Sequence, residues 1–304
     1  MLSTLKQVLS KANKGYYSVG AFNINNMEIL QAIVRAAEKL KSPVILSTSE
    51  GALSYAGKEY LRCLAETASS LTKVPIVLHV DHGRDIELIK KCISLGWTSV
   101  MYDGSHLPFE QNVKNTKKVV SFAHSKGVSV EGELGTIGGA EEKIVARNII
   151  LADPDDAVSF VKQTGVDALA VAVGTSHGAY KFAGAGKIDI ARIREIKRRL
   201  NMPLVLHGAS GVPSDVVALA KKYGAKLGKP EGVPDSQISA AVKAGINKIN
   251  TDTDLRISFD AAVREVLAKK PEDFDPRHIL GPARDFIQKI VEHRIKLFGS
   301  AGKA

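Results

Sequence analysis

The chain has 304 residues, 44% of them hydrophobic and 24% charged, and its formal charge is +10. This is the composition of an ordinary soluble globular protein, and no stretch approaches the roughly 20 apolar residues that span a bilayer. Two cysteines are too few for a disulfide framework, and the N-terminal segment lacks the apolar centre of a signal peptide, so we expect a cytoplasmic protein.

The predicted elements alternate between helices and short apolar strands. An amphipathic helix over residues 1–15 precedes the first strand, and the expected strands cover 20–24, 44–49, 76–83, 99–103, 128–135, 168–173, 203–207 and 245–250. The expected helices between them cover 27–41, 58–72, 85–95, 109–126, 153–165 and 188–200, and a terminal helix covers 282–298. A long connection, 136–152, separates the fifth strand from its helix.

Eight strand–helix units predict an α/β fold, a closed (β/α)8 TIM barrel with an N-terminal helix and a C-terminal helical extension. We expect residues 1–304 to form one domain, because no low-complexity linker interrupts them. An open doubly wound sheet is the alternative. The first strand is not followed by the Gly-x-Gly-x-x-Gly pattern of dinucleotide-binding sheets.

The positive charge is spread in pairs over the predicted helices, and aromatic residues make up only 6% of the chain. A nucleic-acid-binding protein usually gathers its charge in one patch interleaved with aromatics. We therefore expect neither a nucleic-acid nor a membrane partner, and the charge suits a small anionic substrate.

Polar residues follow the strands at one end. In a parallel barrel those ends surround a single mouth, where such folds place their chemistry, so residues far apart in the chain converge there. The residues are Asn23, Ser49, Asp81, His82, Asp103, Glu131, Glu133 and those in the segments 174–178, 207–211 and 250–253.

Three of the chain's eight histidines, His82, His177 and His207, belong to this set. Three imidazoles with an open coordination position are typical of a catalytic zinc site, and zinc suits nitrogen ligands. Their spacing forms no local metal motif, so this prediction depends on the barrel.

Carboxylates could complete the site or hold a second ion, and the candidates are Asp103 and Glu133. Glu131 and Glu133 share one face of their strand because side chains alternate with a period of two. One of the two could therefore bind metal while the other orients a ligand.

Glycines and hydroxyls flank the histidines in 176–178 and 207–211, and Thr253 follows the last strand. Glycine lets backbone N–H groups approach an anion closely, and hydroxyls add donors. Two such loops beside a metal site predict phosphate binding.

Four segments in order resemble the class II, metal-dependent fructose-1,6-bisphosphate aldolases. They are 78–83 (LHVDHG), 174–181 (GTSHGAYK), 206–211 (LHGASG) and 249–256 (INTDTDLR). The similarity covers nearly the whole chain. It implies a zinc enzyme that reversibly cleaves fructose 1,6-bisphosphate into dihydroxyacetone phosphate and glyceraldehyde 3-phosphate.

The resemblance also implies roles for single residues. The three histidines would bind the catalytic zinc, and Asp103 and Glu133 a second or alternative metal position. Asp81 would be the acid/base for the C4 hydroxyl proton. The residues implied at the dihydroxyacetone phosphate end are Gly178, Lys181, Gly208, Ser210, Asn250, Asp252 and Thr253.

Ser49 and Arg256 would contact the other end of the substrate, and Arg277 would reach a phosphate site of a neighbouring subunit. We add Asn23 to the substrate-binding residues. Backbone carbonyls near Gly178 and Gly208 would hold a monovalent cation, Na⁺ or K⁺. The assembly is expected to be a homodimer or homotetramer.

The family has a mobile loop whose glutamate removes the C3 proton of dihydroxyacetone phosphate. The loop here contains Glu141 and Glu142, of which we choose Glu141, with Glu142 as the alternative. Gly138 and Gly139 are plausible hinges for its closure.

Three other functions remain open. In a tagatose-1,6-bisphosphate aldolase of the same superfamily, the last of the four motifs usually resembles Asn-Val-Ala-Thr-Glu-Leu. The segment 250–255 differs from it, which favours fructose. A Schiff-base aldolase would need a lysine inside the barrel, for which Lys248 is the candidate. A non-catalytic basic barrel that binds nucleic acid would leave the converging histidines unexplained.

Overall fold

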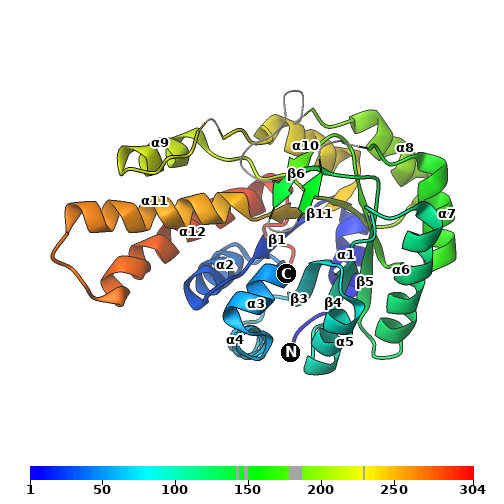
Figure 1. The fold of residues 1–304 in the computed structure, drawn as a ribbon, viewed down its shortest axis with the longest axis horizontal. Helices are drawn as coiled ribbons and strands as arrows, with labels where there is room; N and C mark the ends of the chain where they lie inside the picture. Colours follow the sequence, from blue (N-terminus) through cyan, green and yellow to red (C-terminus); the bar gives the residue numbers. More distant parts are fainter. Residues whose placement is uncertain (142–143, 147–149, 178–186, 229) are drawn as a thin grey trace.

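The computed structural model describes residues 1–141, 144–146, 150–177, 187–228 and 230–304. Eight parallel strands close into a barrel in the order β1-β11-β10-β8-β5-β4-β3-β2, with helices around it (Figure 1). The barrel strands are β1 (Val19–Asn23), β2 (Val44–Ser49), β3 (Ile76–Gly83), β4 (Ser99–Tyr102), β5 (Ser129–Leu134), β8 (Ala168–Val171), β10 (Leu204–Leu206) and β11 (Ile246–Thr251). The predicted (β/α)8 barrel is confirmed, and the open sheet is wrong.

The helices mostly follow the predicted positions. They are α1 (Leu5–Gly15), α2 (Met27–Leu40), α3 (Glu50–Ala56), α4 (Lys58–Leu71), α5 (Ile86–Leu95), α6 (Phe109–His124), α7 (Pro154–Thr164), α8 (Ile190–Leu200), α9 (Ser214–Lys222), α10 (Asp235–Ala244), α11 (Thr253–Lys269) and α12 (Pro276–Phe298). In the part of the chain that the structure describes, no helix has the length and apolar content needed to cross a membrane.

The barrel strands alternate between an outer face covered by helices and an inner face. On β3 the side chains of Ile76 and Leu78 join the large core between strands and helices, whereas Val77 belongs to the cluster inside the barrel. The same alternation turns Glu131 and Glu133 of β5 inward, as their spacing predicts. The interior thus changes from apolar at one end to polar at the other.

Helix α1 closes the apolar end. Its buried residues Leu5 and Leu9 pack against the interior cluster, and the chain just before and within it bonds to the starts of β3 and β5 through Ser3 N to Ile76 O and Lys6 N to Ser129 Oγ. Burying each leucine contributes about 1.5–3 kcal/mol. The opposite end, where the strands finish, remains available for a site.

The long connection after β5 contains a small sheet. β6 (Gly138–Glu141) pairs antiparallel with β7 (Ile144–Ala146) and parallel with β9 (Ser176–His177). The predicted long connection is present, and in its described part the backbone pairs in this sheet outside the barrel. Gly138 and Gly139, the predicted hinges, lie within β6.

Three helices, α9, α11 and α12, extend together away from the barrel (Figure 1). Helices α9 and α11 share a separate apolar cluster that includes Val216, Ala220 and Ala261. The predicted helices do not include α3, α9, α10 and α11, and the predicted last helix starts six residues too late. Helix α12 begins at Pro276 because Asp275 caps it and proline fits the first helical turn.

Candidate active site

The site begins with an irregularity in β3. Asp81 and His82 are neighbours, and in a regular strand their side chains would point to opposite faces. The pairing of β3 with β4 shifts register between Val80 and Gly83, and His82 adopts a left-handed φ of 46°. This bulge directs the imidazole toward the mouth, where Asp81 also points.

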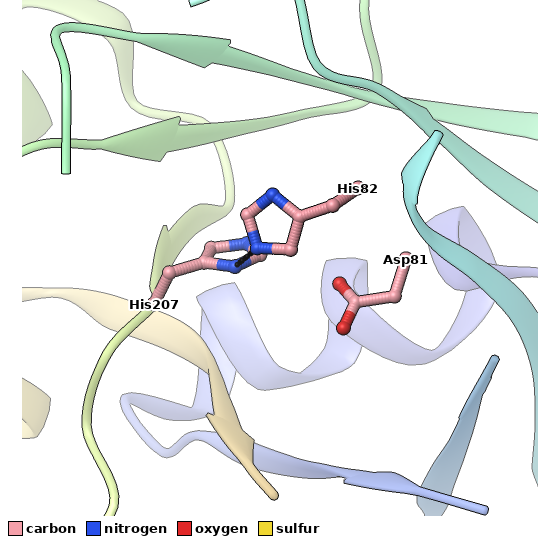
Figure 2. Close-up of side chains that lie close together, drawn as sticks. All are labelled: Asp81, His82 and His207. Atoms are coloured by element: carbon pink, nitrogen blue, oxygen red, sulfur yellow. Dashed lines mark hydrogen bonds between the residues drawn. The ribbon is translucent and has the colours of Figure 1, made fainter. Parts of the chain in front are cut away.

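His82 and His207 meet across the mouth (Figure 2). His82 Nε2 lies 2.8 Å from His207 Nδ1, and the ring centroids are 4.4 Å apart. Figure 2 shows the carboxylate of Asp81 beside this pair. Asp81, His82 and His207 each offer a ligand atom, and these atoms lie within 4.8 Å of one another. Two of the three predicted zinc ligands are thus brought together with the predicted acid/base.

A second group surrounds the other nitrogen of His82. Its Nδ1 lies 3.3 Å from Asp103 Oδ2 and 3.6 Å from Glu133 Oε2. These three residues form another set able to hold an ion. Arg84 pairs with the same oxygen of Asp103 at 3.2 Å. The predicted carboxylates therefore lie on the far side of the His82 ring from His207.

The carboxylates around His82 favour a positive charge at this position. Burial lowers the pKa of His82, but the charges of Asp81, Asp103 and Glu133 outweigh it and raise that pKa to about 10. Burial raises the pKa of Asp103, but the hydrogen bond and charge of His82 hold it well below its usual range. Burial and the Asp103 charge raise the pKa of Glu133 well above normal. Without an ion, the proton on His82 balances the carboxylates.

The donor set fits a metal. In the described residues, Glu133 Oε2 is buried without a hydrogen-bond partner. The proton on His82 Nε2 lies between the two rings and points at His207 Nδ1. A metal cation in place of that proton could accept a lone pair from each nitrogen. Imidazole and carboxylate without thiolate suit zinc.

Glu131 orients His207. Its Oε1 lies 2.8 Å from His207 Nε2, so the ring carries its hydrogen there and leaves Nδ1 for a metal. Lys248 Nζ lies 2.8 Å from Glu131 Oε2, and both side chains are fully buried. The two glutamates of β5 therefore have different partners: Glu133 lies beside His82, and Glu131 bonds to His207 and Lys248.

Asparagine side chains fix Asp81. Asn23 Nδ2 donates to Asp81 Oδ2 at 3.1 Å, and Asn250 Nδ2 donates to Asp81 Oδ1 at 2.9 Å. In the part of the chain described, Oδ1 of both asparagines is buried without a hydrogen-bond partner. Asn23, Asp81 and Asn250 therefore converge from β1, β3 and β11, as predicted.

The loops after β10 and β11 also converge. The backbone N–H of Asp252 donates to Ser210 Oγ at 3.4 Å, and Thr253 begins α11 just beyond. Gly208 has φ 62°, and a Cβ there would meet the backbone carbonyl of Ser176 at 2.6 Å. Only glycine fits this close approach, which sets the loop after β10 against the strand that carries His177.

Ser49 and Arg256 belong to a neighbouring part of the mouth. Ser49 pairs in register with Asp81 and caps α3. Arg256 pairs with Asp252 at 2.7 Å and lines a cavity of about 580 Å³. Its other lining residues are Asn25, Asn26, Ile29, Gly51, Ala52, Tyr55 and Phe259.

Several predicted residues lie wholly or partly outside the described residues, and one lies elsewhere. The backbone of His177 lies in β9 and that of Glu141 in β6, but their side chains are outside the described residues, as are Gly178, Lys181 and Glu142 altogether. Arg277 is exposed and pairs with Asp275 at the start of α12, at the far end of the projecting helices (Figure 1).

Sequence reasoning missed three contributors. Arg84 follows the β3 motif, and Asp254 lies inside the quoted segment 249–256 without an assigned role. Arg294 sits on α12, 40 residues further along, and bonds to Asp254 at 2.9 Å. The position of Asp254 within the segment 249–256 is a signal for its role, whereas no local pattern marks Arg294.

Comparisons with known proteins agree with this geometry. Residues 3–303 match the family model described as "Fructose-bisphosphate aldolase class-II". A fructose-bisphosphate aldolase of Giardia intestinalis is 51% identical over 306 residues, which cover 100% of this chain and 94% of that protein. One of Thermus caldophilus is 48% identical, with 100% of both covered.

Among solved structures, the YdjI aldolase from Escherichia coli K12 superposes with a TM-score of 0.81 at 32% identity, covering 100% of each chain. The resemblance seen in the sequence is confirmed. The chain belongs to the class II fructose-bisphosphate aldolase family.

Proposed function

We propose that this chain cleaves fructose 1,6-bisphosphate reversibly to dihydroxyacetone phosphate and glyceraldehyde 3-phosphate with a bound zinc ion. The observation that carries the proposal is the meeting of His82 Nε2, His207 Nδ1 and the Asp81 carboxylate at the barrel mouth. The family match over residues 3–303 supports one domain over 1–304.

His82, His177 and His207 would hold the zinc, and Asp103 and Glu133 a second or alternative metal position. Zinc, when bound, would polarise the substrate carbonyl as a Lewis acid. The hydrogen bond from His207 Nε2 to Glu131 supports this assignment, because it leaves Nδ1 as the ligating atom.

Asp81 would take the C4 hydroxyl proton in cleavage and return it in condensation. Amide donors from Asn23 and Asn250 hold both of its oxygens, so the carboxylate is oriented before substrate binds. Glu141, or else Glu142, would act at C3.

The dihydroxyacetone phosphate end of the substrate would be bound by Gly178, Lys181, Gly208, Ser210, Asn250, Asp252 and Thr253. Its phosphate would accept hydrogen bonds from the backbone N–H of Gly208 and from the hydroxyls of Ser210 and Thr253. The close packing of Gly208 on Ser176 supports a shared phosphate site for these loops. Asn23 and Asn250 would bind hydroxyls nearby. The carbonyls around Gly178 and Gly208 would hold Na⁺ or K⁺.

Ser49 and Arg256 would contact the other phosphate end, and the cavity of about 580 Å³ beside Arg256 is large enough for it. We also propose a homodimer or homotetramer in the cytoplasm, in which Arg277 serves a neighbouring subunit. Its exposure at the tip of the projecting helices supports a role outside its own barrel.

The Schiff-base aldolase, for which Lys248 is the candidate nucleophile, lacks support. Lys248 does face the interior, but its amine is buried and ion-paired with Glu131 at 2.8 Å. An amine in that state is a poor nucleophile toward a ketone.

The test is cleavage of fructose 1,6-bisphosphate before and after metal removal. We expect a chelator to abolish turnover, zinc to restore it, and borohydride to trap no substrate on the protein. Full activity of metal-free protein, or borohydride trapping, would contradict the proposal. Turnover on tagatose 1,6-bisphosphate, the C4 epimer, measures how strictly the protein selects fructose 1,6-bisphosphate.

A further inference from the structure

A buried ion pair lies behind the loop 208–212. Arg294 of α12 is 2% exposed, and its Nε and Nη2 lie 2.9 and 2.8 Å from Asp254 Oδ2. Asp254, in the first turn of α11, is fully buried. Arg294 also bonds to Asp235 at the start of α10, at 2.9 Å. One side chain thus ties three helices together directly behind the mouth.

Asp254 in turn holds the backbone of the loop. Its Oδ1 accepts the N–H of Val212 at 2.7 Å, and its Oδ2 accepts the N–H of Gly211 at 3.3 Å. Val212 has φ 46°, a left-handed conformation that is strained for a β-branched residue. Such strain persists only where surrounding contacts hold the backbone in place, and the two hydrogen bonds to the Asp254 carboxylate do so.

The packing leaves no room for another arrangement. A Cβ on Gly211 would collide with the Arg294 guanidinium, and a Cβ on Gly232 would collide with the backbone of Gly211. Val233 N donates to Ser210 O at 3.0 Å. Residue 211 must therefore be glycine because the Arg294 guanidinium occupies the space that a side chain would need.

We propose that Asp254 and Arg294 are positioning residues that fix the loop 208–212 for phosphate binding without touching the substrate. This inference rests on the proposed phosphate role of Gly208 and Ser210. Arg294 has two effects: it holds Asp254 in place, and it neutralises a carboxylate that would otherwise repel a phosphate nearby.

The test uses the zinc-loaded full chain with Arg294→Met and Arg294→Lys. We expect Arg294→Met to weaken competitive inhibition by inorganic phosphate and to raise the KM for fructose 1,6-bisphosphate, each on the order of tenfold, because small displacements of binding groups are costly. Zinc content should stay unchanged. Arg294→Lys keeps the charge but loses the planar guanidinium that donates to Asp254 and Asp235 at once. Its KM should therefore rise about threefold with kcat nearly unchanged.

Lys197→Met is the matched control. Lys197 is a half-buried cation at the other end of the barrel, and its Nζ bonds to Met202 O at 2.8 Å and Asn247 Oδ1 at 2.6 Å, where β10 and β11 start. This variant should lose thermal stability yet keep wild-type phosphate inhibition, which separates positioning from general destabilisation.

An Arg294→Met protein with wild-type KM and phosphate inhibition overturns the inference. If that variant does not fold, Arg294→Lys decides: an unchanged KM overturns the inference, and a raised KM supports it. Wild-type protein that inorganic phosphate neither inhibits nor stabilises against heat would instead refute the proposed phosphate role of the loop.

Discussion

The buried pair of Glu131 and Lys248 gives a prediction about metal affinity. At an effective dielectric constant of about 20, two unit charges 2.8 Å apart attract by about 6 kcal/mol. Removing one partner leaves a buried charge and costs about 3–5 kcal/mol of stability, so Lys248→Met alone should be strongly destabilised.

The double variant Glu131→Gln/Lys248→Met removes both charges and keeps both shapes. Its stability should be close to wild type, because a buried ion pair and its neutral replacement often differ little. The introduced amide oxygen can still accept from His207 Nε2, but without charge the bond is roughly half as strong. Loss of such an outer partner lowers zinc affinity about 10- to 100-fold, or about 1.4–2.7 kcal/mol.

The assay is zinc competition against a chromogenic chelator, paired with thermal unfolding of the metal-free protein. The expected result is a near-normal unfolding temperature with weakened zinc binding. A folded double variant that binds zinc as tightly as wild type would refute the role of Glu131 in holding His207.

Three further outcomes are expected. Asp81→Ala should lower kcat by about 10²- to 10⁴-fold while zinc stays bound, measured by turnover and metal analysis; full turnover would remove Asp81 from the reaction. Zinc uptake at pH 7 should release a proton, because the raised pKa of His82, about 10, keeps the metal-free ring protonated; affinity should therefore rise with pH from 7 toward 10, and a flat profile would contradict this. In folded protein, iodoacetamide should modify the exposed Cys63 but spare Cys92, whose pKa burial raises to about 12, and two adducts by mass spectrometry would disagree.

The regular parts of the fold were accessible from sequence because they follow local periodicity. Strand β3 begins and ends where Pro75 and Gly83 predict, and the two-residue spacing of Glu131 and Glu133 places both inside the barrel. The convergence of Asp81, His82 and His207 followed from the topology alone, since parallel strands end at one mouth.

The rest depends on tertiary contacts. The bulge that turns His82 inward arises from pairing with β4, and no residue type near it signals a left-handed backbone. The small sheet joins the neighbouring strands β6 and β7 to β9, which follows only after helix α7 and strand β8. The buried ion pair of Lys248 joins it to Glu131, which is 117 residues away in the chain.

The central claim is that imidazoles 82, 177 and 207 share one ion. Anomalous diffraction at the zinc absorption edge, from crystals of the zinc-loaded protein, tests it most directly. We predict a strong peak bonded to His82 Nε2, His207 Nδ1 and the ring of His177. No peak between these three rings, or rings of His82 and His207 that remain hydrogen-bonded to each other in the loaded protein, would contradict the claim.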